Sequence, residues 1–153
     1  MAADSTYVLD VADRAVLDVL ADNARASIAE IARTVGLAPS TVAERVRRLE
    51  HRGVIRGYRL DVDLTKLGYA LTALVRLTGQ NVNNHALLGK VVDRVPEVLQ
   101  CHRVTGQEGW VLTVVARDVA HLEQVIETLS GYGLPATSIV LSSWTATHLP
   151  PTD

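Results

Sequence analysis

The sequence of 153 residues contains a single cysteine, Cys101, no phenylalanine and only six other aromatic residues. A single cysteine excludes an internal disulfide, and no N-terminal stretch has the basic and then apolar pattern of a secretion signal. No apolar run approaches the roughly 18 residues that a membrane-spanning helix requires. We therefore expect a cytoplasmic protein with no membrane partner, whose buried cores consist mainly of Val, Leu, Ile and Ala.

The net charge is also small, −2 at pH 7, but the charged residues are unevenly distributed. Residues 25–59 contain eight arginines and three glutamates, whereas residues 60–153 contain six basic and nine acidic side chains. Six of the fifteen Lys and Arg side chains lie between Arg45 and Arg59. The total charge alone argues against a polyanionic partner, but this basic block favours one.

Hydrophobic periodicity predicts two short helices near the N-terminus, at residues 10–21 and 27–36. Asp10 is a candidate N-cap of the first helix. Ser27 and Glu30 have the spacing of a capping box at the start of the second, which a glycine ends. Both segments therefore have defined helix boundaries.

A third helix is predicted from Pro39, after a tight turn, to about Arg52, with Val42, Val46 and Leu49 on its apolar face. Its opposite face is polar and rich in hydrogen-bond donors. A helix, a tight turn and a helix with such a face indicate a helix-turn-helix, whose second helix lies in the major groove of DNA. The predicted DNA-binding residues are Ser40, Thr41, Ala43, Glu44, Arg47, Arg48, Arg52 and Arg56.

The N-terminal residues of this third helix are expected nearest the bases, where Glu44 can accept a hydrogen bond from a cytosine amino group. Arg47 and Arg48 could reach bases or phosphates, and the arginines from Arg52 to Arg59 are expected to contact phosphates. The alternative is a solvated helix in which Glu44 pairs with Arg48 at i, i+4 and nothing binds. The preceding helix and turn favour the DNA-binding interpretation.

The rest of the chain alternates strand and helix signals after a connecting segment, residues 54–69, in which VIRGYRLDV has the pattern of a strand. The order βαββαβ predicts a ferredoxin-like domain, an antiparallel four-stranded sheet with both helices on one face. Strands are predicted at residues 71–77, 98–104, 110–117 and 137–144, and helices at 85–95 and 118–131. The expected fold class is α+β: a winged helix-turn-helix domain (residues 1–53), a ferredoxin-like domain (70–147) and a tail (148–153).

The second face of this predicted sheet also carries apolar residues at alternate positions. It contains Val98 or Gln100, and Val111 or Thr113, depending on the strand register. A sheet that is apolar on both faces needs a partner, so we expect this domain to form a homodimer.

Four motifs occur in order along the chain: D-x-x-D-x-x-V-L at residues 10–17, R-V-x-x-L-E-x-x-G-V-I-x-G-Y at residues 45–58, Leu67-Gly68, and P-E-V followed by V-T-G within residues 96–106. With these motifs the chain resembles the Lrp/AsnC family of feast/famine transcriptional regulators over roughly residues 9–145. The resemblance implies a DNA-binding regulator whose C-terminal domains form dimers and usually octamers. It also implies small effectors, commonly amino acids, that bind between neighbouring dimers.

The same resemblance places an effector-binding segment at residues 105–110, where the family pattern is close to T-G-D-Y-D. Gln107 and Gly109 replace both usual aspartates. The carboxylate missing at Gly109 removes a charge-assisted hydrogen bond of roughly 1.5 to 3 kcal/mol, so we expect the usual ligand to be lost. The candidate effector-binding residues are Thr105, Gly106, Gln107, Glu108, Gly109 and Trp110.

Two interpretations of this segment remain open. Glu108 could supply a displaced carboxylate, and Trp110 could offer a ring face to a cation or an apolar side chain. Alternatively, the segment is only a hairpin turn, and Trp110 belongs to a core or an interface. A second departure from the family is Ala38 in place of a capping Ser, which costs about 1 kcal/mol unless Thr41 with Glu44 caps the helix.

No pattern of residues predicts catalysis. We find no Ser/His/Asp arrangement, phosphate-binding glycine loop or paired carboxylates, so we expect neither enzymatic activity nor a cofactor. Cys101 and His102 are neighbours on a predicted strand and point to opposite faces, which favours structural roles over a metal site.

The sequence therefore predicts a regulator whose partners are double-stranded DNA, a small-molecule effector and further copies of itself. Two alternatives remain: an architectural protein that wraps DNA with little sequence preference, and a ligand-sensing module that regulates a protein partner.

Overall fold

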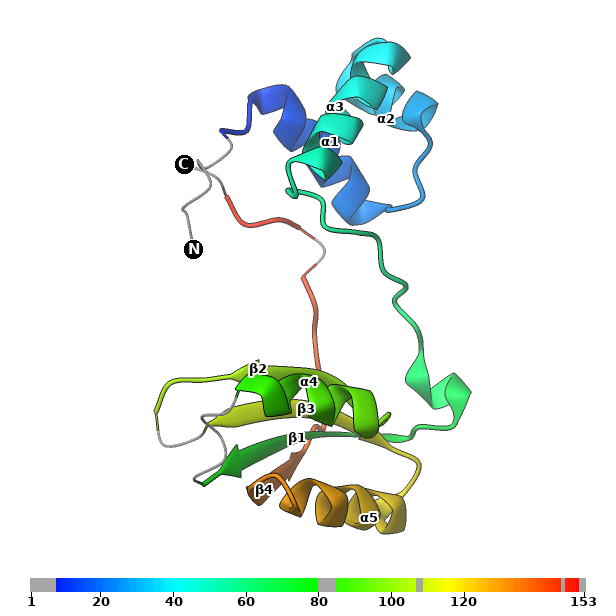
Figure 1. Cartoon of the computed structure of the whole chain (residues 1–153). Helices are drawn as coiled ribbons and strands as arrows, with labels where there is room; N and C mark the ends of the chain where they lie inside the picture. Colours follow the sequence, from blue (N-terminus) through cyan, green and yellow to red (C-terminus); the bar gives the residue numbers. More distant parts are fainter. Residues whose placement is uncertain (1–7, 80–84, 107–108, 147, 152–153) are drawn as a thin grey trace. The chain divides into compact units, whose positions relative to one another are not determined.

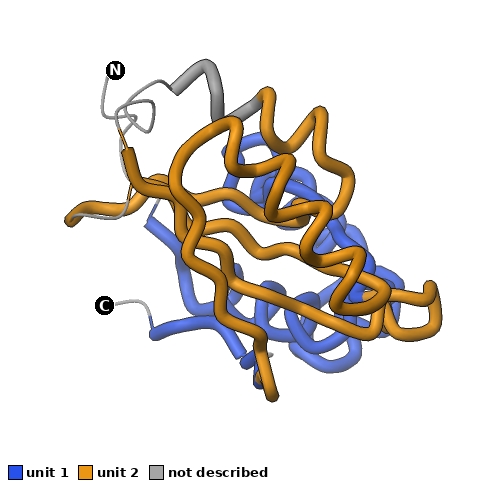
Figure 2. Tube along the Cα trace, turned by 90° about the horizontal axis from the view of Figure 1, so that it is seen from below, with its two compact units in different colours: residues 1–61, 144–153 blue, residues 62–143 orange. Residues whose placement is uncertain are grey.

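The computed structural model of the chain describes residues 8–79, 85–106, 109–146 and 148–151 (Figure 1). The chain divides into two compact units, each with its own core (Figure 2). Unit 1 comprises Met1–Asp61 and Trp144–Asp153, and unit 2 comprises Val62–Ser143. In the part of the chain that is described, no helix is both long and apolar enough to cross a membrane.

Unit 1 contains the three predicted helices, α1 (Val11–Asp22), α2 (Ile28–Val35) and α3 (Pro39–His51). The predicted capping signals are present. The carboxylate of Asp10 accepts a hydrogen bond of 2.7 Å from the backbone N–H of Asp13. Ser27 and Glu30 form the complete capping box, and Gly36 ends α2 with a φ of 70°, a conformation that costs glycine little. The helical part of the prediction is confirmed.

The core of unit 1 consists of aliphatic side chains from the inner faces of the three helices. Its fully buried members are Val16 of α1, Ile31 and Ala32 of α2, and Val42 and Leu49 of α3. Because each helix contributes only one apolar stripe, none could bury it alone. The mutual packing of these stripes directs the polar face of α3 to solvent.

The strand predicted for residues 54–62 does not form. Residues 54–63 contain no strand pairing, and a 3-10 helix, η1 (Leu64–Leu67), follows. The backbone N–H groups of Val54 and Ile55 instead donate to the carbonyl of Leu49, at 2.9 and 3.1 Å, and both side chains pack on the core of unit 1. Val54 and Ile55, β-branched residues that predicted a strand, therefore pack against the helices of unit 1.

Unit 2 has the predicted βαββαβ order, with strands β1 (Leu71–Thr78), β2 (Val98–Arg103), β3 (Trp110–Ala116) and β4 (Leu134–Ile139), and helices α4 (His85–Arg94) and α5 (Val119–Ser130). The sheet is antiparallel, with the order β2-β3-β1-β4. The fold class is thus an N-terminal helix-turn-helix with a C-terminal ferredoxin-like domain, as predicted.

The last strand differs from its predicted position at residues 137–144. β4 begins three residues earlier and ends five residues earlier, because Leu134 pairs with Thr78 and Ile139 with Ala73 of β1. Pro135 lies within this strand, although a proline in the sequence normally argues against a strand. β4 is at the edge of the sheet, where the missing N–H of a proline is tolerated.

Both helices of unit 2 lie on one face of the sheet (Figure 1). That face carries buried side chains from the two central strands, including Val75 and Leu77 of β1 and Trp110 and Leu112 of β3. They pack with residues of α5 such as Leu129 to form the core of unit 2.

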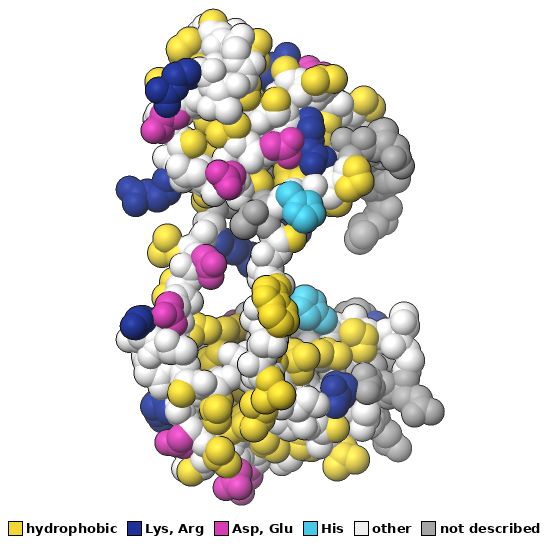
Figure 3. Space-filling model, turned by 180° about the vertical axis from the view of Figure 1, so that it is seen from behind, with side chains coloured by type: hydrophobic (Ala, Val, Ile, Leu, Met, Phe, Trp, Pro, Cys, Tyr) yellow, Lys and Arg dark blue, Asp and Glu magenta, His cyan; other side chains and the backbone are white. Residues whose placement is uncertain are grey.

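The opposite face of the sheet is partly apolar and is not covered by a helix. Leu74 of β1 lies opposite Thr113 of β3 on this face and is 37% exposed. Val111 and Gln100 also point to it, whereas Val98 is buried in the core on the helix side. Figure 3 shows hydrophobic side chains gathered over unit 2 on this side of the molecule. The expectation of an apolar second face is therefore confirmed in part, with Gln100, His102 and Arg76 among its polar members.

Candidate nucleic-acid interface

The outward face of α3 presents most of the predicted DNA-binding side chains to solvent. Ser40, Thr41, Glu44, Arg47 and Arg48 are exposed and Ala43 is half-buried, whereas Val42 and Leu49 on the inner face are fully buried. α3 follows α2 after a short turn, in which the N–H of Leu37 donates to the carbonyl of Ala32 at 3.1 Å. This is the arrangement of a helix-turn-helix with its second helix free to enter a groove.

The N-terminus of α3 has no side-chain cap. Ala38 occupies the N-cap position, and neither Thr41 nor Glu44 supplies the missing hydrogen bond. Pro39 at the first helical position reduces the loss, because it has no N–H that needs an acceptor. The backbone N–H groups of the first turn therefore have no competing side chain, which suits a helix end that meets phosphate oxygens.

Glu44 pairs with Arg47 and not with Arg48. The Nη1 atom of Arg47 lies 2.7 Å from the carboxylate of Glu44, and both side chains are about 70% exposed. An ion pair with this exposure contributes about 0 to 1 kcal/mol. Both groups can therefore exchange this partner for a base or a phosphate at little cost.

Arg48 instead bonds a buried carboxylate of α1. Its Nη2 atom lies 2.9 and 3.2 Å from the two carboxylate oxygens of Asp13, which is only 1% exposed. The sequence predicts Arg48 as a direct contact to bases or phosphates. Its side chain is still 41% exposed, so Arg48 is both a structural link between α1 and α3 and part of the outward face.

Arg45 completes this cluster, which the sequence analysis missed. Its Nη1 atom donates to Asp13 at 2.7 Å and to Asp10 at 2.6 and 2.8 Å. Its Nε atom is buried and, among the described residues, has no hydrogen-bond partner. We call Asp10, Asp13, Arg45 and Arg48 the acidic brace; the D-x-x-D motif and the spacing of the two arginines were the available sequence signal.

The brace shifts the ionisation of its members. Hydrogen bonds from Arg45 are the main cause that holds the pKa of Asp10 below its usual value of 3.8, with a further contribution from the N–H of Asp13. The same contacts raise the pKa of Arg45, with Asp10 the larger contributor. The ion pair between Asp10 and Arg45 is therefore fully charged at neutral pH.

Four of the predicted residues meet around one hollow on the surface of unit 1. The hollow has a volume of about 360 Å³ and is lined by Ser40, Thr41, Glu44, Arg45 and Arg48. It combines hydroxyl, carboxylate and guanidinium groups at the N-terminal half of α3, the part of a recognition helix that contacts base edges. Such a set can donate to and accept from base edges and phosphates.

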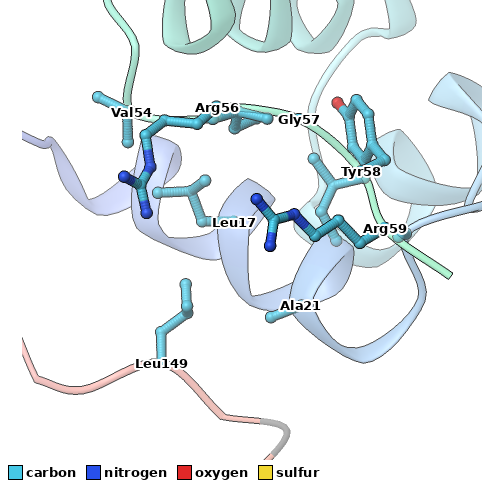
Figure 4. A pocket seen from close by; sticks show the side chains of 11 residues that line it. Leu17, Ala21, Val54, Arg56, Gly57, Tyr58, Arg59 and Leu149 are labelled. Carbon is cyan, nitrogen blue, oxygen red and sulfur yellow. The ribbon is translucent and has the colours of Figure 1, made fainter. Parts of the chain in front are cut away.

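Arg52 and Arg56 do not line this hollow. Arg52 is the C-cap of α3, and its N–H donates to the carbonyl of Arg48 at 2.9 Å. Arg56 lies in the extended segment after α3 and lines a different hollow together with Arg59 and residues of α1 (Figure 4). Ser40, Thr41, Glu44 and Arg48 thus cluster around the first hollow. Arg52 lies at the end of α3 and Arg56 beyond it.

The candidate effector segment is a hairpin connection between β2 and β3. The N–H of Val104 donates to the carbonyl of Gly109, and the N–H of Gly109 donates to that of Leu77, both at 3.1 Å. Thr105 and Gly106 are exposed, and Gln107 and Glu108 lie outside the described residues.

Trp110 is fully buried in the core of unit 2. Its ring therefore does not face solvent, and its assignment as a ligand contact is corrected. The resemblance to the family placed Trp110 in the effector segment, but β3 directs this side chain to the helix-covered face, as the alternative interpretation of a core residue expected.

No metal centre is present among the residues that the structure describes, since no three His, Cys, Asp or Glu side chains are grouped to hold an ion. Cys101 is half-buried beside the core of unit 2, and burial raises the pKa of its thiol. This environment suits a packed thiol and not a reactive one.

Comparisons with known proteins agree with this geometry. Residues 9–56 match the model of winged helix-turn-helix DNA-binding domains, and residues 71–149 match the Lrp/AsnC ligand binding domain. The HTH-type transcriptional regulator YezC of Bacillus subtilis is 36% identical over 135 residues, which cover 88% of this chain and 95% of that protein.

Two solved structures have the same fold over nearly their whole length. The structure of LrpC from Bacillus subtilis has a TM-score of 0.84 and 29% identity and covers 91% of this chain and 99% of that one. A transcriptional regulator from Neisseria meningitidis in complex with L-methionine has a TM-score of 0.83 and 28% identity and covers 94% and 97%. With the exposed α3 of unit 1 and the ferredoxin-like unit 2, these matches show that the chain belongs to the Lrp/AsnC family, whose members are DNA-binding transcriptional regulators and not enzymes.

Proposed function

We propose that this regulator binds specific, roughly palindromic DNA sites as a homodimer, with α3 of each subunit in the major groove. The observation that carries the proposal is the exposed polar face at the start of α3, opposite an inner face whose Val42 and Leu49 are fully buried. In this geometry Ser40, Thr41 and Glu44 lie nearest the base edges, and Arg47 reaches a base or a phosphate. Arg52 and Arg56 contribute phosphate contacts.

The proposed dimer forms through the uncovered face of the sheet in unit 2. Leu74 and Val111 provide its apolar centre, and a second copy of the same face would remove them from water. Two helix-turn-helix units related by a two-fold axis then read half-sites about 34 Å apart, one turn of the duplex. Further association of dimers to an octamer belongs to the same proposal, by analogy with the family.

The proposed effector is an amino acid or a related small metabolite, and no cofactor is involved. The ligand-binding domain match and the L-methionine complex of the Neisseria meningitidis regulator support this class. The candidate residues are Thr105, Gly106, Gln107, Glu108 and Gly109. Because Gly109 offers no carboxylate to an ammonium group, we expect weak or no binding of leucine. A regulator of this kind acts in the cytoplasm, where the DNA is.

Binding of labelled duplexes at 50 and 200 mM salt tests the proposal. The protein should prefer DNA from its own upstream region over a shuffled duplex of equal length by about a thousandfold or more. Its affinity should fall steeply with salt, because each neutralised phosphate releases about 0.9 counterions. Equal affinity for both duplexes would contradict sequence specificity.

Two variants that each remove one exposed arginine of unit 1 locate the surface that binds. Arg47→Ala should weaken binding to the upstream duplex by about tenfold, a typical effect of losing a charge-assisted contact. Arg33→Ala, on α2, removes the same charge and should change the affinity less than about twofold. Equal effects of the two variants would refute a role for α3. A footprint much longer than one operator, with helical periodicity, would indicate DNA wrapping instead.

A further inference from the structure

The second hollow of unit 1 lies between α1 and the extended segment that follows α3, away from the face of α3 that lines the first. It has a volume of about 360 Å³, within the range of roughly 300 to 1,000 Å³ typical of small-molecule pockets. Its apolar lining comes from Leu17, Leu20 and Ala21 of α1, Ala24 just after that helix, Val54 and Ile55 of the segment, and Leu149 near the C-terminus.

Two arginines give this hollow a cationic rim. In Figure 4 the side chains of Arg56 and Arg59 extend over α1, with Leu17 between their guanidinium groups. Both are exposed, and neither makes an ion pair within the described parts of the chain. Tyr58, between them in sequence, also lines the hollow, and its hydroxyl donates to Glu50 at 3.0 Å.

The local backbone explains why the two arginines share one side. Gly57 has a φ of 148°, which residues with a side chain rarely adopt, and it reverses the alternation of the extended segment between Arg56 and Tyr58. No β-carbon contact limits this position, so the glycine serves the backbone conformation and not close packing.

The C-terminal segment fixes the far wall of the hollow. The guanidinium of Arg14 on α1 donates to the carbonyl of Leu149 at 2.9 Å and also to that of Pro150. Arg14 is held in turn by Asp18 at 2.9 Å. These bonds place the side chain of Leu149 towards α1. The apolar lining of the hollow therefore comes both from α1 and from the C-terminal segment of the chain.

We infer that this hollow is a binding site for a small carboxylate with an apolar body, separate from the effector segment of unit 2. The guanidinium groups of Arg56 and Arg59 can each donate to a carboxylate, and neither has an acidic partner among the described residues to compete. The aliphatic part of the lining accepts an uncharged chain, and the lining residues include no carboxylate that could pair with an ammonium group. The site therefore selects a simple acyl or aromatic carboxylate over a zwitterionic amino acid.

Calorimetric titration of the full chain with octanoate tests this inference without DNA. We expect saturable binding of one octanoate per chain, whereas octan-1-ol, which lacks the carboxylate, and acetate, which lacks the apolar body, should each bind at least about tenfold more weakly. Absence of saturable octanoate binding, or equal affinity for octan-1-ol, would overturn the inference.

Three variants locate the octanoate. R56Q/R59Q should weaken its binding at least about tenfold. The matched control R25Q/R33Q removes two exposed arginines elsewhere in unit 1 and should change the affinity less than twofold. Ala21→Phe places a ring in the hollow and should also abolish binding, with circular dichroism to verify the fold. Wild-type affinity in R56Q/R59Q or in Ala21→Phe would place the ligand elsewhere and refute the site.

A regulatory consequence follows, and this part alone rests on the proposed function. Arg56 and Arg59 are also expected phosphate contacts, so bound octanoate should weaken DNA binding and reduce the slope of log K against log salt by up to about 2, since each lost phosphate contributes about 0.9. Octanoate that binds without any change in DNA affinity would contradict this coupling. Calorimetry decides the site itself even if the protein binds no DNA.

Discussion

Replacement of Asp13 by asparagine tests the acidic brace. The substitution keeps the shape of the side chain but removes a carboxylate that is 1% exposed and accepts from Arg45 and Arg48 at 2.7 and 2.9 Å. Removing one partner of a buried ion pair costs about 3 to 5 kcal/mol. Two features of the brace reduce that cost: Arg45 retains Asp10, and Arg48 is 41% exposed and can be solvated. We therefore expect a loss of about 2 kcal/mol in the stability of unit 1, which is below that range.

Hydrogen exchange measured by mass spectrometry reports this loss locally, because unit 2 serves as an internal reference. Protection of the amides in α1 and α3 should fall about 30-fold in Asp13→Asn, the equivalent of 2 kcal/mol, with unit 2 unchanged. Asp10→Asn is the matched control. Its side chain is 52% exposed and asparagine also caps helices, so its loss of protection should be clearly smaller than that of Asp13→Asn. Equal protection in wild type and Asp13→Asn would refute the reasoning.

Further predictions concern the helix cap, the titration of the brace and the uncovered face of the sheet. Ala38→Ser should supply the missing N-cap of α3 and raise protection of its first amides about fivefold, the equivalent of about 1 kcal/mol; no change in exchange would mean that Pro39 already meets the need. Because the pKa of Asp10 is lower in the folded chain than its usual 3.8, its ion pair stabilises the protein above that pH and is lost as the pH falls through the folded pKa. Urea midpoints between pH 2 and 6 should therefore drop less steeply in Asp10→Asn than in wild type, and parallel curves would disagree with this assignment. Leu74→Asp should convert the proposed dimer to monomers in light scattering while Thr72→Asp, in the same strand, has a smaller effect; an unchanged mass for Leu74→Asp would place the interface elsewhere.

The helices and the fold class could be predicted from the sequence because local signals and the long-range packing agree. Asp10, Ser27 and Gly36 mark helix ends through bonds to their own neighbours, and the periodic apolar residues between them face one core. The same agreement holds for the order of elements in unit 2. Such signals lie within a few residues of the element that they define, so they do not depend on distant parts of the chain.

The errors lie where a local pattern depends on a distant partner. Residues 54–62 have the composition of a strand, but no neighbouring strand pairs with them, and Val54 and Ile55 pack on helices instead. β4 is shifted towards Pro135 because pairing with β1, and not the β-branched run that follows, sets its ends.

The candidate site shows the same limit. Its exposed face could be predicted from the periodicity of α3, but the partner of Arg48 could not, since Asp13 lies 35 residues away in the sequence. The burial of Trp110 likewise depends on which face of the sheet the helices cover.

The most direct test of the central claim, that α3 reads bases in the major groove, is the base preference of the double variant E44A/R47A. The two side chains pair with each other at 2.7 Å, so their joint removal leaves the net charge and the overall attraction to DNA unchanged. Binding would be measured to operator duplexes in which each base pair of a half-site is varied in turn. If α3 reads bases, the variant should lose discrimination of about 1 to 3 kcal/mol at one or two positions per half-site, with shuffled DNA bound as by wild type. An identical preference at every position in both proteins would contradict it.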